Sequence, residues 1–337
     1  MNISLIERLR RTFLFDSIDL HFAEFIYSKE NEAVKEITPF FAAVASSSLN
    51  KGHICVNLKD FLNQLLRNEE VSDSEAIKMP DVNEWKKTIE LSDTIGNIHE
   101  YKPLLYDGDY LYLNKFYHYE LNVFQKIIEL CSSKETFKLN YELLNSMFDN
   151  QADIMQKNAC HAALENKFCV ISGGPGTGKT TIIAKMLYLL LFENQNLKIA
   201  LATPTGKASA RMNEAIAFSL HNIKEHILNK NPEFLKEEII NKISKTEART
   251  IHRLLETFGN YFDFVHNRDN TLYHDIFIID EASMIDIALV SKLFDAIKPS
   301  AKIILIGDKN QLSSVEAGSF FSDICESAED NGCFINK

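Results

Sequence analysis

The amino-acid sequence predicts an α/β protein with two parts, a mostly helical domain at residues 1–145 and a domain built on a parallel sheet at residues 146–337. Three observations predict this fold. Apolar residues recur at helical spacing in the front part. From about residue 166 they gather instead in short runs, as in buried parallel strands. The first of these runs leads into GGPGTGKTT, a glycine-rich loop that opens a helical stretch.

The composition is that of a globular protein. Of the 337 residues 45% are hydrophobic, enough to fill the cores of two domains. The net charge is -11, and residues 1–150 hold 16 Lys and Arg against 24 Asp and Glu, which argues mildly against DNA as the partner of the front part. The six cysteines show no metal-ligand spacing, and no run approaches the ~20 apolar residues of a membrane span. We therefore expect reduced thiols, a cytoplasmic location and no membrane contact.

Two stretches of the front part have helical apolar spacing: SLIERLRRTFLFDSIDLHFAEFIY at residues 4–27 and LKDFLNQLLRN at residues 58–68. A hairpin-like piece, LLYDGDYLYLNKFYHYE at residues 104–120, interrupts this pattern. Asp107 and Gly108 supply turn chemistry between its alternating residues. No constellation of catalytic residues is evident in this part.

Four apolar runs predict parallel strands in the second part: KFCVISG, LKIALAT, DIFIIDE and AKIILIGD. Small or polar residues follow each run, as expected where the loops after parallel strands carry function. Roughly seventy residues separate the second run from the third, which is too many for a plain crossover connection. We therefore predict an inserted subdomain at about residues 212–272.

The loop after the first run contains the complete pattern GxxxxGK[ST] at residues 173–180. Glycines let the backbone N–H groups turn toward a phosphate, and the N-terminus of the following helix adds its positive dipole end. Lys179 is expected to reach the β- and γ-phosphates of a nucleotide, and the Thr180 hydroxyl to bind Mg²⁺. A loop that keeps this shape without a ligand is the alternative. The candidate cofactor-binding residues here are Gly173, Gly174, Pro175, Gly176, Thr177, Gly178, Lys179, Thr180 and Thr181.

Two further strand ends carry candidate catalytic groups. Asp280 and Glu281 end the third run, where one carboxylate can hold Mg²⁺ and the next can deprotonate the attacking water. This pair favours hydrolysis over phosphoryl transfer to a second substrate, so a P-loop kinase is disfavoured. Gln311 follows the fourth run, where an uncharged amide can contact the γ-phosphate; an ordinary surface loop is the alternative.

Taken together, these residues resemble a known family. GGPGTGKTT, LATPTGKASARM, TIHRLL, IIDEASMID and GDKNQLSSVEAGSFFSDI are similar, in this order, to motifs I, Ia, Ic, II and III of superfamily 1 helicases of the 5′-to-3′ branch, and among them to the RecD family. GHICVNL and PLLYDGDYLYLNKFYHYE resemble the N-terminal domain of that family, which packs against the RecC subunit. The resemblance covers nearly the whole chain.

The resemblance implies an ATP-dependent 5′-to-3′ DNA helicase subunit of a RecBCD (exodeoxyribonuclease V) complex that acts in double-strand break repair and recombination. Its implied partners are RecB- and RecC-like subunits and single- and double-stranded DNA ends, and its implied cofactors are ATP and Mg²⁺. Gln156 is similar to the glutamine that reads adenine. The implied DNA-binding residues are Thr203, Pro204, Thr205, Thr250 and His252, for which loop chemistry, capping and packing are the ordinary alternatives.

One departure from the family pattern affects the expected activity. The family's motor has two RecA-like lobes, and this sequence stops at Lys337, shortly after motif III. We therefore expect one RecA-like lobe, without the second lobe and its transition-state arginine, and weak ATP hydrolysis by the isolated chain. The alternative is a nucleotide-binding scaffold subunit that does not translocate. No further carboxylate cluster indicates a nuclease, so DNA cleavage is expected of another subunit.

Overall fold

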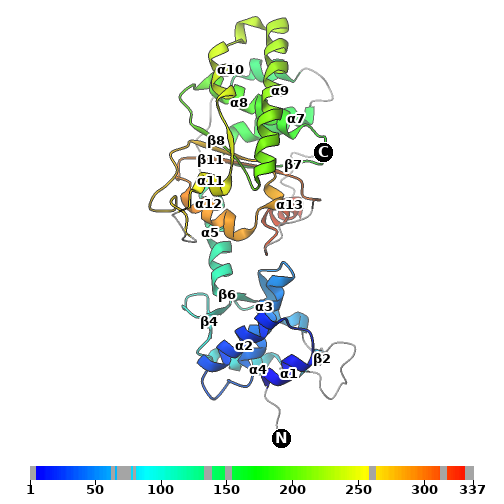
Figure 1. The fold of residues 1–337 in the computed structure, drawn as a ribbon, viewed down its shortest axis with the longest axis vertical. Coiled ribbons are helices and arrows are strands. Elements are labelled where there is room, and N and C mark those ends of the chain that lie inside the picture. Colours follow the sequence, from blue (N-terminus) through cyan, green and yellow to red (C-terminus); the bar gives the residue numbers. More distant parts are fainter. Residues whose placement is uncertain are drawn as a thin grey trace. The chain divides into compact units, whose positions relative to one another are not determined.

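The computed structural model describes residues 5–61, 65–66, 77–78, 81–132, 139–148, 154–257, 263–311 and 317–330 (Figure 1). It divides into two compact units. Unit 1 consists of Met1–Leu121 with Val315–Gly318, and unit 2 consists of Asn122–Ser314 with Ser319–Lys337. The bounds that we predict for the functional domains, 145/146 and 212–272, stay predictions.

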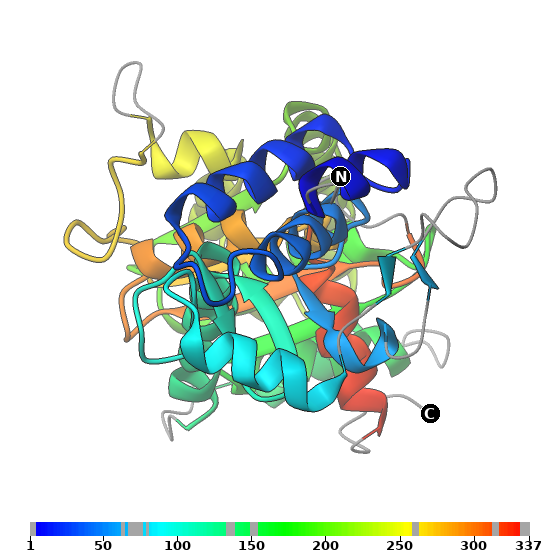
Figure 2. The same cartoon turned by 90° about the horizontal axis from the view of Figure 1, so that it is seen from below.

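Unit 1 combines helices with a small mixed sheet. The helices α2 and α3 pack against each other, and they enclose a core with Trp85 from α4. Both helices belong to the blue group in Figure 2, together with α1. The four-stranded sheet has the order β1-β6-β5-β4, and β2 pairs with β3 separately. The elements are α1 (Leu5–Arg11), α2 (Ser17–Lys29), α3 (Thr38–Asn50), β1 (Cys55–Asn57), η1 (Leu58–Phe61), β2 (Leu65–Leu66), β3 (Ile77–Lys78), α4 (Val82–Leu91), β4 (Ile95–Asn97), β5 (Leu104–Tyr106) and β6 (Tyr110–Leu113).

The predicted hairpin is present, but it is shorter than expected. β5 and β6 pair antiparallel, and Asp107 Oδ1 accepts hydrogen bonds from the backbone N–H groups of Asp109 and Tyr110. From Asn114 the chain forms the helix α5 (Asn114–Cys131). The helix is favoured over a longer hairpin because its side chains Val123, Lys126 and Leu130, which lie at helical spacing, are buried by tertiary contacts.

The helix predicted at residues 58–68 is wrong in part. A single turn of 3-10 helix occupies Leu58–Phe61, and Leu65–Leu66 form a strand. Apolar spacing over eleven residues fits an amphipathic helix, yet strand pairing with Ile77–Lys78 overrides it here. Residues 62–64 lie outside the described part of the chain.

Unit 2 is built on a parallel sheet of five strands with the order β7-β11-β10-β8-β9. The four predicted strands are all present and parallel to their neighbours. The edge strand β9 was not predicted, because three residues with one buried side chain give no apolar run. The strands are β7 (Phe168–Ser172), β8 (Ile199–Thr203), β9 (Ala248–Thr250), β10 (Ile276–Ile279) and β11 (Lys302–Gly307).

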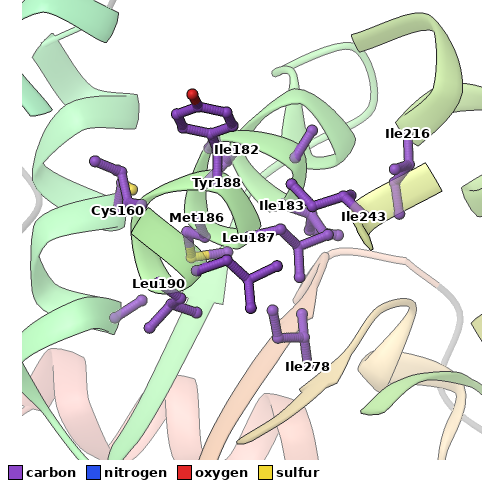
Figure 3. Close-up of a cluster of buried hydrophobic side chains, with 14 of the residues drawn as sticks. Cys160, Ile182, Ile183, Met186, Leu187, Tyr188, Leu190, Ile216, Ile243 and Ile278 are labelled. Atoms are coloured by element: carbon purple, nitrogen blue, oxygen red, sulfur yellow. The ribbon is translucent and has the colours of Figure 1, made fainter. Parts of the chain in front are cut away.

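Helices cover both faces of this sheet (Figure 1). On one face, the side chains of α8 pack toward the strands, and Ile183 and Leu187 lie over Ile278 of β10 (Figure 3). On the other face, Phe294 of α12 contacts Phe168 of β7 with ring centroids 6.5 Å apart. The helices are α6 (Tyr141–Met147), α7 (Ile154–Glu165), α8 (Lys179–Glu193), α9 (Gly206–Lys230), η3 (Pro232–Phe234), α10 (Glu237–Ser244), α11 (Ile251–Leu255), η4 (Ala282–Met284), α12 (Ile287–Ala296) and α13 (Phe320–Asp330).

The segment predicted as an insertion lies within unit 2. It shares α9, which begins at Gly206 and packs against α8, and it supplies β9 to the sheet. None of the helices in the described residues has the length and apolar character that crossing a membrane requires. The five cysteines within the described residues form no disulfide with one another, and Cys333 lies outside that part of the chain.

A buried lysine joins the sheet to α7. Lys302 begins β11 with no exposed surface, and its ammonium donates to the carbonyls of Ala163 (2.9 Å) and Leu164 at the C-terminus of α7. Burial lowers the pKa of Lys302 to about 7. The carbonyl ends of a helix favour a cation, so this contact sets the position of α7 against the sheet at the cost of desolvating a charge.

We expect Lys302→Met to flatten the pH dependence of stability. The pKa of Lys302 is about 7 in the native state and ordinarily 10.5. Between these values the unfolded chain binds more protons, so the wild-type free energy of unfolding rises with pH. Below the native pKa the folded protein bears the full cost of burying a charged lysine. Above the pKa of the unfolded chain this cost is absent. Between these two pKa values the free energy of unfolding of the wild type should rise, relative to that of the variant, by on the order of a few kcal/mol. Urea denaturation at a series of pH values measures this.

The control is Lys298→Met, which removes a partly exposed ion pair with Asp275 (Nζ to Oδ1 2.7 Å) instead of a buried ammonium. If the unfolding free energies of wild type and Lys302→Met run parallel from neutral to alkaline pH, Lys302 is not buried as a destabilised cation.

Candidate nucleotide-binding site

The glycine-rich loop connects the end of β7 to the start of α8, as predicted. Its backbone is left-handed at Gly176 (φ 77°) and Gly178 (φ 83°), a conformation that favours glycine. The Gly173 N–H donates to the Gly307 carbonyl (3.0 Å), which fastens the loop to the neighbouring strand β11. No side chain caps the N-terminus of α8. The first N–H groups of this helix are therefore suited to an anion.

Lys179 lies across this loop. Its ammonium donates to the carbonyls of Gly173 (2.6 Å) and Gly174 (3.4 Å). The Thr177 hydroxyl also donates to the Gly174 carbonyl (2.8 Å). These neutral acceptors are weaker partners for an ammonium than phosphate oxygens, so Lys179 can exchange them for a nucleotide phosphate without moving far from the loop. No hydrogen bond links the Thr180 or Thr181 hydroxyl to another described residue.

Gln156 of α7 contacts the same loop. Its side-chain amide donates to the Thr177 carbonyl (3.0 Å). A Cβ placed on Gly178 would lie 2.7 Å from the Gln156 amide nitrogen, so a side chain there would displace this amide, and the positive φ also favours glycine. The structure thus places Gln156 beside the phosphate loop, although its role with adenine stays a prediction.

Asp280 and Glu281 follow β10. The Asp280 N–H donates to the Ala202 carbonyl (2.9 Å), and its carboxylate accepts from the Glu281 N–H (2.9 Å). Asp280 is only 8% exposed. Burial raises the pKa of Asp280, as does the Glu281 charge, while the Glu281 N–H and the Lys179 ammonium oppose this shift. A buried carboxylate within the field of Lys179 is suited to a cation ligand, which makes the donor set compatible with Mg²⁺.

Glu281 has a strained backbone. Its φ of 55° and ψ of 37° lie in the left-handed region, which is uncommon for a residue with a side chain. Its Oε2 atom is buried, and it has no hydrogen-bond partner. Strain and an unpartnered carboxylate oxygen together are typical of functional positions.

The end of β11 lies between the other two strand ends, because β11 pairs with β7 on one side and β10 on the other. A Cβ on Gly307 would lie 3.0 Å from the Ser283 nitrogen, so the turn η4 packs directly against this strand end. Asp308 is buried, and its carbonyl accepts from the Gln311 N–H (3.1 Å). Gln311 is exposed, and residues 312–316 of the same motif lie outside the described part.

The predicted DNA-binding residues lie at one edge of the sheet. Thr203 and Thr250 are register partners in β8 and β9. Their local roles are structural: the buried Thr203 hydroxyl donates to the Thr205 carbonyl (3.0 Å), and the hydroxyls of Thr205 and Thr250 cap α9 and α11. Pro204 lies between the two threonines of the first segment.

Like Thr205, His252 is exposed. Its ring lies 5.7 Å from the ring of Phe264, edge to face. Thr205 and Thr250 thus have capping roles, and His252 packs against Phe264. Contact of these residues with DNA stays a prediction.

Sequence reasoning missed one residue of the candidate site and one residue that supports it from the other end of β11. Ser283 is buried beside Gly307, and Lys302 orders the helix that carries Gln156. The place of Ser283 two residues after Glu281 was the available signal for the first. Nothing local marks Lys302, because its burial arises from contact with α7.

Two family models match separate parts of this chain. Residues 12–112 match the family model described as "RecBCD enzyme subunit RecD, N-terminal domain", and residues 156–317 match the model of an AAA domain. The RecD subunit of Mycolicibacterium smegmatis is 30% identical over 95% of this chain and 54% of its own length. That of Buchnera aphidicola subsp. Schizaphis graminum is 33% identical over 98% of this chain and 54% of its own. The chain thus spans about half the length of the curated relatives it matches.

Among solved structures, the UvsW helicase from Bacteriophage T4 matches 55% of this chain and 68% of its own, at 13% identity and a TM-score of 0.34. This likeness is too weak to support an argument.

We expect Gly178→Ala to destabilise unit 2 and to displace Gln156. An alanine at positive φ costs on the order of 1 kcal/mol, and the added methyl group collides with the Gln156 amide. Gly174→Ala is the matched control in the same loop, since its φ is not positive and no atom lies within 4 Å of the added carbon. Urea denaturation without nucleotide should show a loss only for Gly178→Ala. Equal stability of both variants would contradict this loop geometry.

Proposed function

The chain belongs to the RecD family, and from this premise we propose that it binds Mg-ATP and single-stranded DNA as the helicase subunit of a RecBCD-type (exodeoxyribonuclease V) complex. The observation that carries this proposal is that Lys179 follows β7 and the pair Asp280–Glu281 follows β10, at the same end of a parallel sheet, where the charge of Lys179 acts on Asp280. A phosphate-binding loop opposite two strand-end carboxylates is the arrangement that nucleoside triphosphate hydrolysis needs.

The residues of the loop supply the nucleotide-binding half. The N–H groups at the start of α8 and the Lys179 ammonium hold the β- and γ-phosphates. Thr180 and Asp280 hold Mg²⁺, which neutralises charge on the phosphate oxygens. Gln156 contacts the adenine from its place on α7, next to the loop.

The strand ends supply the hydrolytic half. Glu281 orients a water molecule and accepts its proton as the water oxygen attacks the γ-phosphorus and the bond to the β,γ-bridging oxygen breaks. Gln311 contacts the γ-phosphate from the end of β11 and reports its loss. Because β11 lies between β7 and β10, a shift at this strand end can reach both the loop and η4.

The neighbouring strand ends supply the proposed DNA contacts. Thr203 ends β8 and is followed by Pro204 and Thr205, and Thr250 ends β9 two residues before His252. A single strand that crosses this edge would meet both segments. The threonine hydroxyls are engaged in caps, so we assign phosphate contact to the backbone of these loops and base contact to His252. Such contacts do not read sequence, which suits a translocating motor.

The remaining functions follow from family membership. We propose 5′-to-3′ unwinding of DNA ends in double-strand break repair and recombination, with RecB- and RecC-like partners and unit 1 as the partner-binding part. Because the proposed substrate is DNA, we expect the protein in the cytoplasm. Because the chain spans about half of its relatives, we expect weak turnover by these residues alone.

We expect Lys179→Ala to weaken ATP binding by at least about tenfold, because one charge-assisted contact with phosphate is lost. Isothermal calorimetry with Mg²⁺ and a slowly hydrolysed ATP analogue measures this. The control is Lys224→Ala, which removes an ion pair between Lys224 of α9 and Glu237 of α10. In the assembled complex, Lys179→Ala should abolish 5′-to-3′ unwinding by this subunit. Undiminished unwinding would end the proposal.

We expect His252→Ala to weaken binding of single-stranded DNA by about tenfold, since stacking of one base on an aromatic ring contributes ~1–3 kcal/mol. Fluorescence anisotropy with a labelled oligothymidine measures the affinity. His221→Ala is the matched control, because His221 is also an exposed histidine on a helix and forms an ion pair with Glu225 of the same helix. If both variants bind DNA as the wild type does, base contact does not involve His252.

A further inference from the structure

The turn after the acidic pair contains two buried polar atoms without partners. Ser283 lies on η4 and is 5% exposed, and its hydroxyl makes no hydrogen bond. Two residues earlier, Glu281 Oε2 is also buried and unpartnered. In the described part of the chain only two other buried side-chain atoms share this condition, Trp85 Nε1 and His274 Nδ1.

The two atoms have complementary chemistry. A serine hydroxyl can donate a hydrogen bond, and an ionised carboxylate oxygen can only accept one. Folding gains nothing from leaving both unsatisfied, because each has lost water without gaining a protein partner. The left-handed backbone of Glu281 adds strain at the same turn. These costs are explained if the two groups meet in another state of the site.

The surroundings of Ser283 connect it to the neighbouring strand end. Its backbone nitrogen would lie 3.0 Å from a Cβ at Gly307, and Phe321 of α13 would lie 2.9 Å from the same carbon. η4 therefore lies in direct contact with the end of β11. A change at the Gly307–Gln311 strand end can pass through this contact to Ser283 and Glu281.

Resting on the function proposed above, we propose that Ser283 is a positioning residue for ATP hydrolysis. When nucleotide and the attacking water are bound, the Ser283 hydroxyl donates to Glu281 Oε2 and holds that carboxylate in the orientation that accepts the proton of the water. The hydrogen bond forms only in the reacting state, so it contributes to hydrolysis and not to nucleotide binding. Ser283 itself touches neither nucleotide nor water.

A purely structural serine at this position behaves differently. Ser291 of α12 is the matched case, a buried serine of the same segment whose hydroxyl accepts from the Asn122 amide (2.9 Å). Replacing Ser291 by alanine removes a hydrogen bond that exists in the fold and should lower stability. Replacing Ser283 removes none, so Ser283→Ala should leave the melting temperature unchanged or raised.

The test uses the full chain as wild type, Ser283→Ala, Ser283→Thr, Ser291→Ala and Glu281→Gln. Affinities for Mg-ADP and for Mg-ADP with aluminium fluoride, a mimic of the transferring phosphoryl group, are measured by displacement of a fluorescent nucleotide. ATP hydrolysis is measured with single-stranded DNA present. Ser283→Ala should bind ADP as the wild type does, bind the aluminium fluoride complex about tenfold more weakly and lose about tenfold in kcat at unchanged KM. Ser283→Thr, which keeps the hydroxyl, should restore both.

The controls separate the possible failures. Ser291→Ala should lose stability without changing the ratio of the two affinities. If Glu281→Gln weakens the aluminium fluoride complex while Ser283→Ala does not, only the role of Ser283 is overturned. If Glu281→Gln has no effect, or the wild type does not distinguish the two ligands, the proposed hydrolytic site fails together with this inference. Equal weakening of both ligands by Ser283→Ala also overturns it, since that is loss of ordinary binding.

Discussion

Parallel pairing of β7, β11, β10 and β8 is the constraint on which the candidate site depends. Parallel strands end at the same edge of a sheet, so the phosphate loop, the acidic pair, the glutamine segment and the threonine loop all arise there. The register is supported by burial, since Ile278 pairs with Ile304 and Leu201 in the centre of the sheet. A different strand order would keep every motif in the sequence and separate the side chains.

The core supports groups that are unfavourable by themselves. A buried Asp280, a buried Lys302, a left-handed Glu281 and unpartnered atoms at Glu281 and Ser283 each oppose folding. The apolar helix α8 lies against the sheet with nearly all of its interior side chains buried (Figure 3). Burial on this scale stabilises the unit enough to hold a preorganised polar site at its edge.

Much of the fold could be predicted from local pattern. The four strands of unit 2, the helix after the glycine-rich loop and the turn at Asp107 and Gly108 are present as predicted. Each has a strong local signal, namely an apolar run or a turn residue. The errors concern short or amphipathic segments: residues 58–68 are not one helix, residues from Asn114 leave the hairpin for α5, and β9 had no signal. There, contacts with distant residues outweigh local preference.

The sequence by itself determined the chemistry at each strand end, because Gly176, Gly178, Lys179 and the pair Asp280–Glu281 are specified by residue type and spacing. Only the tertiary structure decided which ends are neighbours: β11 between β7 and β10, Thr203 beside Thr250, and Ser283 buried against Gly307. The physical reason is that strand order and burial arise from contacts between segments far apart in the chain. Such contacts leave no periodic trace in the residues that make them.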